Sequence, residues 1–506
     1  MMAAGIRNLL ALVLLALLGA CAAPQPANLP PEYELPVAQS AFWEEIAGAR
    51  SGDWFYLLNA GDEALRMRLQ MIDSAQESID LETFLWKPDK TGQRIQAHLL
   101  AAADRGVRVR FLLDDSFTMH EDLALHGLDD HPNISLRIYN PFRHRSDNAL
   151  FRQLFNIGEF NRVNHRMHNK LLVVDGRAAL VGGRNLADEY FGNHDELNFR
   201  DMEVITMGES VPATTQHFDA FWNSGWAFPL NDIMPEPANA HSLDKLRANL
   251  AGSVGVPVVA SRAELVAGWA KEAQAAYAGT ATFFYDQPAS LDPASPDEMP
   301  DQLADELQQL IDMAENEVIL VSAYLVPTPA LEDVVERAEA RGVNVRILTN
   351  SLKSNNHLAA HAAYRGHITQ LVDNGADLHE VRVTAADRDL YMQQPIDEKG
   401  LGLHAKLLLI DDHLAFIGSC NLDPRSLKIN TEVGLVIDSV ELNQSLRKHL
   451  EIDFHPRNAW AVKRSDEGQL VWVGEENEVH TSFPDASNIE RLEDWFIGLL
   501  PIDGEM

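Results

Sequence analysis

The chain repeats one domain-sized pattern at a constant spacing of 236 residues, and this limits the folds open to it more than any other feature. Several separate landmarks share the register, so the match is not a chance likeness of one short motif. The repeated pairs are Arg105 and Arg341, His168 and His404, Lys170 and Lys406, Asp175 and Asp411, Gly182 and Gly418, and Asn185 and Asn421. Because the period is as long as a domain, we interpret the chain as a duplication of one fold unit and not as a solenoid.

Each unit alternates segments that are typical of strands and helices. The predicted strand, helix and strand are residues 78–86, 92–104 and 107–113 in the first unit, and 317–326, 331–340 and 343–348 in the second. This order implies a parallel pair of strands with a right-handed crossover. Two apolar runs separated by a turn predict a hairpin over 171–181 and another over 407–417. The predicted fold class is therefore α/β.

Composition removes several classes of function. The chain has 506 residues and is 46% hydrophobic, which is typical of packed globular protein and excludes general disorder. It carries 41 basic and 75 acidic residues, a formal net charge of −34, which repels phosphate polyanions at long range. We therefore expect no nucleic-acid partner. Two cysteines, Cys21 and Cys420, cannot form a disulfide scaffold or a zinc site of several thiolates.

The first residues predict export. Residues 1–20 carry one charge, Arg7, and an apolar run over 9–18 that has the size of a signal-peptide core. The run ends in Leu-Gly-Ala before Cys21, which resembles the bacterial lipoprotein cleavage box, so we expect Cys21 to be lipidated. A plain secretory signal or an uncleaved anchor is the alternative. Because Ala22 follows, the outer membrane is favoured, and we expect the protein at the periplasmic face of a bacterial membrane.

These signals divide the chain into five parts. Residues 1–20 are the predicted signal peptide, and the proline-rich stretch within 21–45 is a lipidated tether. The first unit covers 46–230 and the second 301–506. Between them, 231–300 is predicted to be a linker region that is partly helical in its middle and ends as a loop rich in proline and acids.

Reactive side chains gather at the two His-x-Lys motifs. In an extended strand, residues i and i+2 point to one face, so each histidine lies beside its lysine. Imidazole can attack phosphorus or donate a proton near neutral pH, and the lysine supplies positive charge for a phosphoryl group. Two copies allow one histidine to attack while the other protonates the leaving alkoxide. The lysines and asparagines can neutralise the phosphoryl oxygens, so we expect neither a metal nor another cofactor.

The pattern HxKxxxxD followed by GGxN or GSxN, present twice, resembles the phospholipase D superfamily. Flanking text resembles its cardiolipin synthase branch, at residues 84–87, 102–107, 348–352 and 418–426. The resemblance implies two phospholipase D-type units, each a mixed sheet flanked by helices, packed about a pseudo-twofold interface that holds one active site. It also implies a phosphohistidine intermediate, phospholipid partners such as phosphatidylglycerol and phosphatidylethanolamine at a membrane surface, and cardiolipin as the product.

Other activities remain open. A hydrolase would pass the same intermediate to water and release phosphatidic acid, and no residue marks an acceptor site unambiguously. A nuclease is disfavoured by the net charge and by export. A lipid-binding lipoprotein with a vestigial site would need no turnover, but both motifs are complete.

The resemblance also assigns roles to residues. His168 would be the nucleophile and His404 the general acid, although the two motifs are too alike to fix the order. Phosphate would be bound by the paired lysines and asparagines together with Ser419. Each histidine needs a carboxylate on its other ring nitrogen, for which Glu203 and Glu432 are the candidates. Asp175 and Asp411 complete the motif as candidate catalytic residues, with turn capping as the favoured alternative.

Basic residues concentrate just before the first motif. The window 141–170 holds six basic residues against two acidic ones, in a chain that is strongly acidic overall. Such a window predicts either a site for an anionic head group or a solvated surface.

Overall fold

The computed structural model describes residues 27–33, 40–48, 52–118, 122–145, 152, 156, 159–235, 241–289 and 302–498. The predicted signal peptide, Cys21 and the start of the tether lie outside the described residues. Within the described part of the chain, no helix has both the length and the apolar character needed to cross a membrane.

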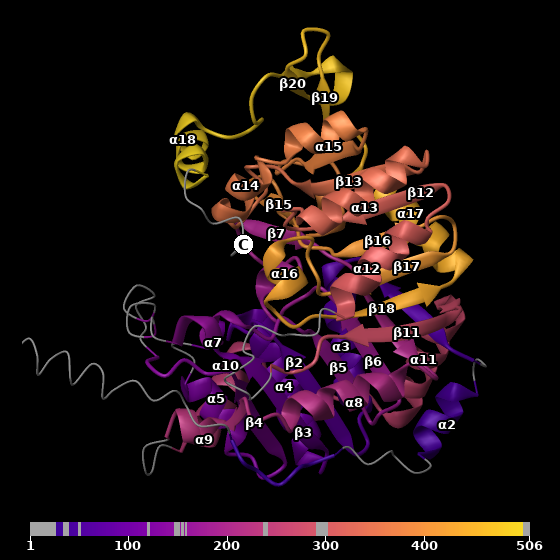
Figure 1. Ribbon diagram of the computed structural model, residues 1–506. Coiled ribbons are helices and arrows are strands. Elements are labelled where there is room, and N and C mark those ends of the chain that lie inside the picture. Colours follow the sequence, from indigo (N-terminus) through magenta and orange to yellow (C-terminus); the bar gives the residue numbers. More distant parts are fainter. Residues whose placement is uncertain are drawn as a thin grey trace, which may run out of the picture.

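The first unit is built on a nine-stranded sheet, in the order β10-β1-β8-β6-β5-β2-β3-β4-β9 (Figure 1). Its strands are β1 (Trp54–Leu58), β2 (Ser78–Thr83), β3 (Arg108–Asp114), β4 (Ile134–Tyr139), β5 (Leu171–Val174), β6 (Ala178–Gly182), β8 (Glu203–Met207), β9 (Ala227–Pro229) and β10 (Tyr277–Ala278). Its helices are α2 (Ala41–Ala47), α3 (Gly61–Ser74), α4 (Lys90–Asp104), α5 (Asp122–Asp129), α7 (Phe160–Asn164), α8 (Val211–Trp222), α9 (Leu230–Ile233), α10 (Ser242–Ser253) and α11 (Arg262–Ala275), with short 3-10 turns η1 (Asp115–Phe117) and η3 (Asp188–Tyr190).

The second unit repeats this plan around a ten-stranded sheet, in the order β11-β18-β17-β16-β12-β13-β14-β19-β20-β21. Its strands are β11 (Thr280–Tyr285), β12 (Glu317–Val321), β13 (Asn344–Asn350), β14 (Asp377–Val381), β16 (Leu407–Ile410), β17 (Leu414–Gly418), β18 (Val433–Asp438), β19 (Ala459–Arg464), β20 (Leu470–Val473) and β21 (Val479–His480). Its helices are α12 (Gln302–Met313), α13 (Pro329–Ala340), α14 (Leu358–Tyr364), α15 (Ile368–Asn374), α16 (Pro424–Lys428), α17 (Val440–Asp453) and α18 (Asn488–Ile497), with 3-10 turns η4 (Arg388–Leu390) and η5 (Glu475–Asn477).

The predicted strand–helix–strand units and hairpins are confirmed. β2 and β3 run parallel with α4 between them, and β12 and β13 run parallel around α13. In the first unit, Asp89 caps the start of α4 by accepting from Gly92 N, and Gly106 follows its end at a φ of +96°. That left-handed conformation suits glycine and turns the chain into β3. β5 with β6 and β16 with β17 form the two antiparallel hairpins.

Both units share one core. A single cluster of buried apolar side chains includes Val173 and Phe218 of the first unit with Val321 and Leu407 of the second. β7 (Leu197–Arg200) and β15 (Gly400–Leu403) pair in parallel as a separate two-stranded sheet, with one strand from each unit. In Figure 1 this pair lies where the magenta and orange halves meet. The interface is therefore a packed layer and not a flexible joint.

The predicted linker region is helical in its middle, as expected, but it also holds two strands that were not predicted. Residues 231–289 include α10, α11, β10 and β11, while the predicted loop at 290–300 lies outside the described residues. β10 pairs with β1 of the first sheet, and β11 pairs with β18 of the second. The chain therefore crosses from one sheet to the other at Gly279, where a side chain would meet Asp438 O at 2.4 Å. The β-rich run from Thr280 to Tyr285 carried a strand signal that the division at residue 301 missed.

Candidate active site

The two histidine motifs lie at the interface, each held by the other unit. β5 begins only at Leu171 and β16 at Leu407, so both motifs occupy the extended segments that lead into these strands. His168 N donates to Thr431 O at 3.0 Å, and His404 N donates to Arg200 O at 2.8 Å. Each histidine backbone is thus anchored to a segment of the opposite unit, which turns both motifs toward the shared boundary.

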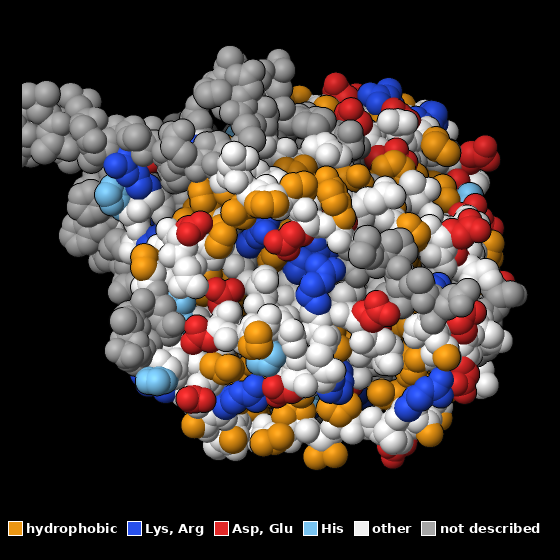
Figure 2. Space-filling view, turned by 90° about the horizontal axis from the view of Figure 1, so that it is seen from below, with side chains coloured by type: hydrophobic (Ala, Val, Ile, Leu, Met, Phe, Trp, Pro, Cys, Tyr) orange, Lys and Arg blue, Asp and Glu red, His pale blue; other side chains and the backbone are white. Residues whose placement is uncertain are grey.

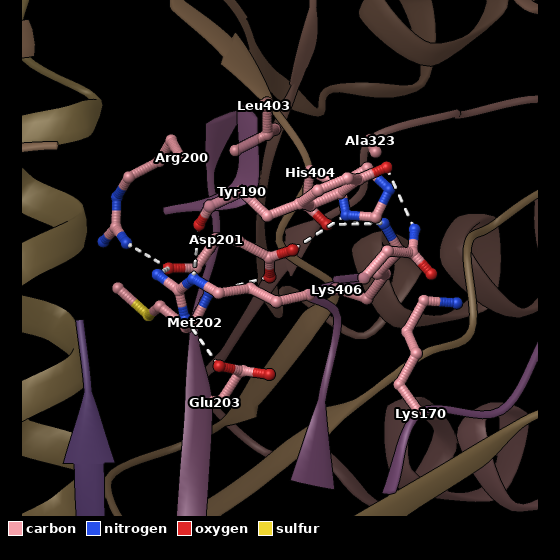
Figure 3. A network of polar contacts seen from close by, with 12 residues as sticks. Lys170, Tyr190, Arg200, Asp201, Met202, Glu203, Ala323, Leu403, His404 and Lys406 are labelled. Carbon is pink, nitrogen blue, oxygen red and sulfur yellow. Dashed lines mark hydrogen bonds and ion pairs between the residues drawn. The ribbon is translucent and has the colours of Figure 1, made fainter. Parts of the chain in front are cut away.

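Carboxylates reach the imidazoles by the same crossed arrangement. Glu432 Oε1 lies 2.8 Å from His168 Nδ1, and Asp201 Oδ2 lies 2.8 Å from His404 Nδ1. Figure 3 shows Asp201 directed at the His404 ring, with Glu203 lying apart from it. A carboxylate on Nδ1 fixes the tautomer and leaves Nε2 as the reactive nitrogen. The expected contact of Glu432 with a histidine is present.

The prediction that Glu203 orients a histidine is wrong. Its carboxylate is fully buried and pairs with Arg68 and with Arg184, the latter at 3.1 Å. The strand pairing aligns Glu203 with Gly434, two residues beyond Glu432. Glu203 pairs with Gly182 in the first sheet, where Gly434 pairs with Gly418 in the second. Asp201 is consequently the counterpart of Glu432.

The residue that follows the first motif glycine differs between the units, Gly183 in one and Ser419 in the other, and each suits the carboxylate beside it. At Gly183 an added Cβ would lie 2.5 Å from Asp201 Oδ1, so only glycine leaves room for this short acid. The counterpart Ser419 donates its hydroxyl to Glu432 Oε2. Ser419 was expected to bind phosphate, but its hydroxyl is committed to the carboxylate. Asp286 adds further support by accepting from Glu432 N at 2.9 Å.

Both motif lysines are buried beside the histidines. Lys170 and Lys406 have exposed fractions of 3% and 1%, and each Nζ donates to the carbonyl oxygen of its own histidine. Lys406 Nζ also lies 3.1 Å from His404 Nδ1. The ammonium group of Lys406 is close enough to lower the pKa of Lys170, so the two motifs converge on one place (Figure 3).

Burial controls the charges in this site. It lowers the pKa of Lys170 to about 7 and that of Lys406 to about 8, and it holds the pKa of both imidazoles well below the ordinary value. Burial likewise raises the pKa of Glu432 to about 8 and raises that of Asp201. The site therefore favours neutral imidazole, the nucleophilic form, and burial outweighs the carboxylates of Glu432 and Asp201, which favour the charged lysines. A bound phosphate group would add negative charge and favour the charged lysines further.

The two motif asparagines differ in their partners. Asn185 Oδ1 accepts from Leu85 N at 3.2 Å, and its Nδ2 donates to the Tyr190 hydroxyl at 2.9 Å. Asn421 is buried, and its Oδ1 has no hydrogen-bond partner among the described residues. The predicted role of Asn185 as a phosphate ligand is therefore weakened, because its amide already serves the protein.

Asp175 and Asp411 cap turns, and neither contacts an imidazole. Asp175 lies at the end of β5 opposite Lys170 and accepts from the backbone N of residues 76, 77 and 78 and from Trp43 Nε1. Asp411 accepts from the backbone N of residues 315, 316 and 317. Their contacts are those of the turn-capping alternative, and the predicted catalytic role has no contact in the site to support it.

Aromatic rings flank both imidazoles, and sequence reasoning gave them no role in the site. The Phe84 ring lies 5.0 Å from that of His168, edge to face. Tyr190 and Phe199 lie 4.9 and 5.4 Å from the ring of His404. These rings keep water from the sides of the imidazoles, which explains much of the desolvation. The motif pattern carries no signal for them, because they come from other segments.

Of the basic window, Lys170 is the cation that lies in the site. Arg145 pairs with buried Asp115 at 3.0 Å, Arg166 with buried Asp114 at 3.4 Å, and Arg162 with Glu159. These three arginines are neutralised by neighbouring acids, so they do not form an open anion site.

The comparisons with known proteins agree with this geometry. The family model described as "Cardiolipin synthase, PLD-like domain" matches residues 69–222 and 307–454, more than half of the chain. The chain belongs to the phospholipase D superfamily, in its cardiolipin synthase branch. It is therefore an enzyme of the phosphatidyltransferase type. The two matched ranges coincide with the two units that carry His168 and His404.

Relatives match over most of their length. The chain is 33% identical to cardiolipin synthase C of Escherichia coli (strain K12), over 81% of this chain and 86% of the relative. It is 28% identical to cardiolipin synthase B of Salmonella typhi, over 80% and 81%. The crystal structure of phosphatidylserine synthase from Haemophilus influenzae superposes with a TM-score of 0.58 at 13% identity, covering 92% of this chain and 100% of that one. That match concerns the fold alone.

Proposed function

We propose that the protein forms cardiolipin by moving a phosphatidyl group from one phospholipid onto phosphatidylglycerol through a phosphohistidine. The observation that carries this proposal is the crossed pair of contacts, Glu432 to His168 and Asp201 to His404, beside two buried lysines. Double displacement at phosphorus needs a nucleophile and a separate proton donor. Two oriented imidazoles beside two lysines that can bind a phosphate group meet this need.

In the first step, His168 Nε2 attacks the phosphorus and the bond to the leaving oxygen breaks. His404 Nε2–H donates its proton to that oxygen, so the alcohol leaves neutral. The substrate phosphate raises the pKa of His404 toward the protonated form, and Lys170 and Lys406 neutralise the phosphoryl oxygens. The phosphorus is then bonded to His168, whose cationic ring donates Nδ1–H to Glu432.

In the second step, a hydroxyl of phosphatidylglycerol attacks the same phosphorus. Neutral His404 accepts the hydroxyl proton, the phosphorus–nitrogen bond breaks, and free His168 is restored. Each step exchanges one bond at phosphorus and moves one proton, so the cycle balances. Attack by water in this step would release phosphatidic acid instead.

His168 is the better supported nucleophile. A phosphohistidine keeps a positive charge on its ring for the lifetime of the intermediate. His168 has Glu432 on Nδ1 and lies close enough to the Asp114 carboxylate for that charge to favour the cation. The segment before His404 is held by Asn350, a neutral amide in the place of Asp114. The electrostatics therefore favour the longer-lived cation on His168.

We also propose that the enzyme works at a membrane surface, exported and attached through lipidated Cys21. Helix α18 exposes Ile489, Leu492, Trp495 and Phe496, with exposed fractions between 49% and 69%. Its buried Asp494 bonds His361 Nδ1 of α14 at 2.7 Å, which fixes the helix with the apolar side outward. Such a face suits the boundary between lipid and water.

The face shown in Figure 2 offers little to nucleic acid. On the face shown in Figure 2, basic side chains are scattered among acidic and apolar ones, and no continuous basic stripe crosses it. With a net charge of −34, this distribution supports phospholipid over nucleic acid as the anionic substrate.

The decisive experiment follows lipid products from the purified protein. Vesicles containing labelled phosphatidylglycerol, with and without phosphatidylethanolamine, are incubated with wild type and with His168→Ala, and lipids are separated by thin-layer chromatography. We expect labelled cardiolipin from wild type and none from the variant. Phosphatidic acid as the sole product would reject transfer in favour of hydrolysis, and trapping of label on His404 would reverse the assignment of the nucleophile.

A further inference from the structure

A buried polar cluster lies directly behind the first motif. His217 of α8 has its Nε2 2.7 Å from Glu82 Oε1 of β2, and both side chains are fully buried. Asn169, between His168 and Lys170, places its Nδ2 3.4 Å from the same nitrogen and is also fully buried. Rings of Phe221 and Tyr285 lie within 4.8 Å of the His217 ring. The mechanism above uses none of these three polar residues.

This cluster lowers the stability of the folded protein. Glu82 Oε2, Asn169 Oδ1 and His217 Nδ1 are buried without a hydrogen-bond partner among the described residues. Buried polar atoms without partners destabilise a folded protein, and a buried ion pair often contributes less to stability than apolar side chains of similar size. Stability alone therefore does not explain why the first unit holds these residues.

The second unit shows that the fold can do without them. Asn169 corresponds to Ala405 in the repeat register. From the pairing of the strands β2 with β3 and β12 with β13, Glu82 corresponds to Val321. The N-caps Ser210 and Ser439 align helices α8 and α17, which places Leu446 at the position of His217. These three counterparts are all buried in the same apolar core.

The histidine segments also differ in front of the motif. Asn350 accepts from Leu403 N at 2.8 Å and donates to Leu403 O at 2.8 Å. It therefore bonds both backbone polar groups of the residue before His404. The counterpart Asp114 accepts from Met167 N at 2.9 Å, but a carboxylate cannot donate to a carbonyl.

Backbone contacts of the motif show the same difference. In the second unit, both His404 N and Ala405 N donate to Arg200 O, at 2.8 and 3.1 Å. In the first unit the corresponding bond is that of His168 N to Thr431 O, and no second bond of this kind joins Asn169 to Thr431 in the described structure. Thr431 N also donates to Arg166 O at 2.9 Å, but no counterpart of the Ala405 bond holds Asn169 itself among the described residues.

We propose that His217 and Glu82 form a positioning pair that holds Asn169 from behind, and so sets where His168 and Lys170 meet the phosphorus. The cluster replaces the bonds that Asn350 and Ala405 provide in the second unit. Asp114 brings a negative charge that favours the cation on His168. It cannot make the hydrogen bond to a carbonyl oxygen that the amide of Asn350 donates in the second unit. The pair restores the rigidity of the segment. This inference rests on the proposed function, because it concerns the residue proposed to attack.

The second unit supplies the residues for the test. The triple variant Glu82→Val, Asn169→Ala, His217→Leu installs the side chains of Val321, Ala405 and Leu446 in the first unit. We expect a Tm equal to or above that of wild type, a KM for phosphatidylglycerol within about twofold, and a kcat reduced by about tenfold to a hundredfold. Formation of phosphohistidine in a single turnover should slow by the same factor.

Matched variants make each outcome decisive. Ile79→Val copies Val318 at another buried position of β2 and should leave kcat unchanged. His217→Gln retains a donor for Glu82 and should recover most of the lost rate. If the triple variant does not fold, Asn169→Ala alone removes the contact with His217 and keeps the contact between His217 and Glu82, and it should lower kcat with KM unchanged. Wild-type rates of phosphohistidine formation in the folded triple variant or in Asn169→Ala would overturn the inference. A wild type that forms no phosphohistidine would instead reject the proposed function.

Discussion

Glu432 Oε1 lies 2.8 Å from His168 Nδ1, although the two residues stand in different halves of the duplicated chain. The mirrored contact joins Asp201 to His404. Each half therefore provides the imidazole of one pair and the carboxylate of the other. This exchange explains why the chain retains both copies, since neither half contains a complete pair of histidine and carboxylate.

The first prediction separates Asp201 from Glu203. Asp201→Asn should lower kcat by about 10²- to 10⁴-fold, because an amide cannot stabilise the His404 imidazolium and can hold the wrong tautomer. Its Tm should change little. Glu203→Gln should instead cost about 3–5 kcal/mol of unfolding free energy, because it leaves Arg68 and Arg184 buried without their carboxylate.

Thermal unfolding and steady-state kinetics on the folded fraction check this pair of variants against each other. The assignment fails if Glu203→Gln loses its turnover at an unchanged Tm while Asp201→Asn stays active.

A second prediction concerns the pH dependence set by Ser419. Burial raises the pKa of Glu432 to about 8, and the hydroxyl of Ser419 works against this by donating to the carboxylate. Ser419→Gly copies Gly183 and removes that donor, so the pKa of Glu432 should rise further. Because the ionised carboxylate supports the His168 cation, the rising limb of kcat/KM should move to higher pH. The loss of activity should be largest near about pH 7 and smaller near about pH 9. A profile lowered by one factor at every pH would contradict this link.

The lysines give a third prediction, about anion binding. The pKa of Lys170 is lowered to about 7 and that of Lys406 to about 8, while a bound anion favours their charged forms. Binding should therefore take up protons, and the Kd for tungstate should rise as pH increases above about 8. Calorimetry in buffers of different ionisation enthalpy measures the uptake directly. Lys170→Met should weaken binding and flatten its pH dependence, whereas a wild-type Kd that is constant across this range would show that the lysines stay charged in the empty site.

Much of the fold followed from the sequence, because the duplication aligned weak signals from two halves. Residues near Arg105 and near Arg341 predicted the same helix end, and both strand–helix–strand units formed as expected. The segment before the second unit was harder to predict. β10 has only two residues, Tyr277 and Ala278, and its partner β1 lies more than 200 positions away, so no local pattern marks it.

The site was predicted in its histidines and lysines and missed in the residues around them. His168 and His404 stand in a fixed sequence pattern. The carboxylate partner does not, and the sequence fitted Glu203 as well as Asp201, so the prediction chose the wrong acid. Which of two nearby acids faces an imidazole depends on the register between β6 and β8, and that is a pairing across the sheet. Asp114 and Asn350 do occur at the constant spacing of 236 residues, so the signal for their shared role was present.

The fourth prediction tests the close approach at Gly183. Gly183→Ala would bring a methyl group to 2.5 Å from Asp201 Oδ1 and push the carboxylate away from His404. We expect kcat to fall by about a hundredfold with little change in lipid affinity. Gly252→Ala is a matched control, because an added Cβ there meets nothing within 4 Å. Equal activity of the two variants would show that Asp201 is not confined by the backbone at Gly183.

The last prediction concerns the motif aspartates, which the pattern alone would assign to catalysis. Asp175 accepts from three backbone N–H groups and from Trp43 Nε1, and it is buried, so Asp175→Ala leaves several donors without partners. We expect a loss of about 2–4 kcal/mol in unfolding free energy, with kcat per folded molecule within about threefold of wild type. Asp411→Ala should lose less, because this carboxylate is partly exposed and water can replace it. Denaturant unfolding combined with activity corrected for the folded fraction decides the matter. An Asp175→Ala protein that is fully folded and inactive would show that the aspartate takes part in catalysis.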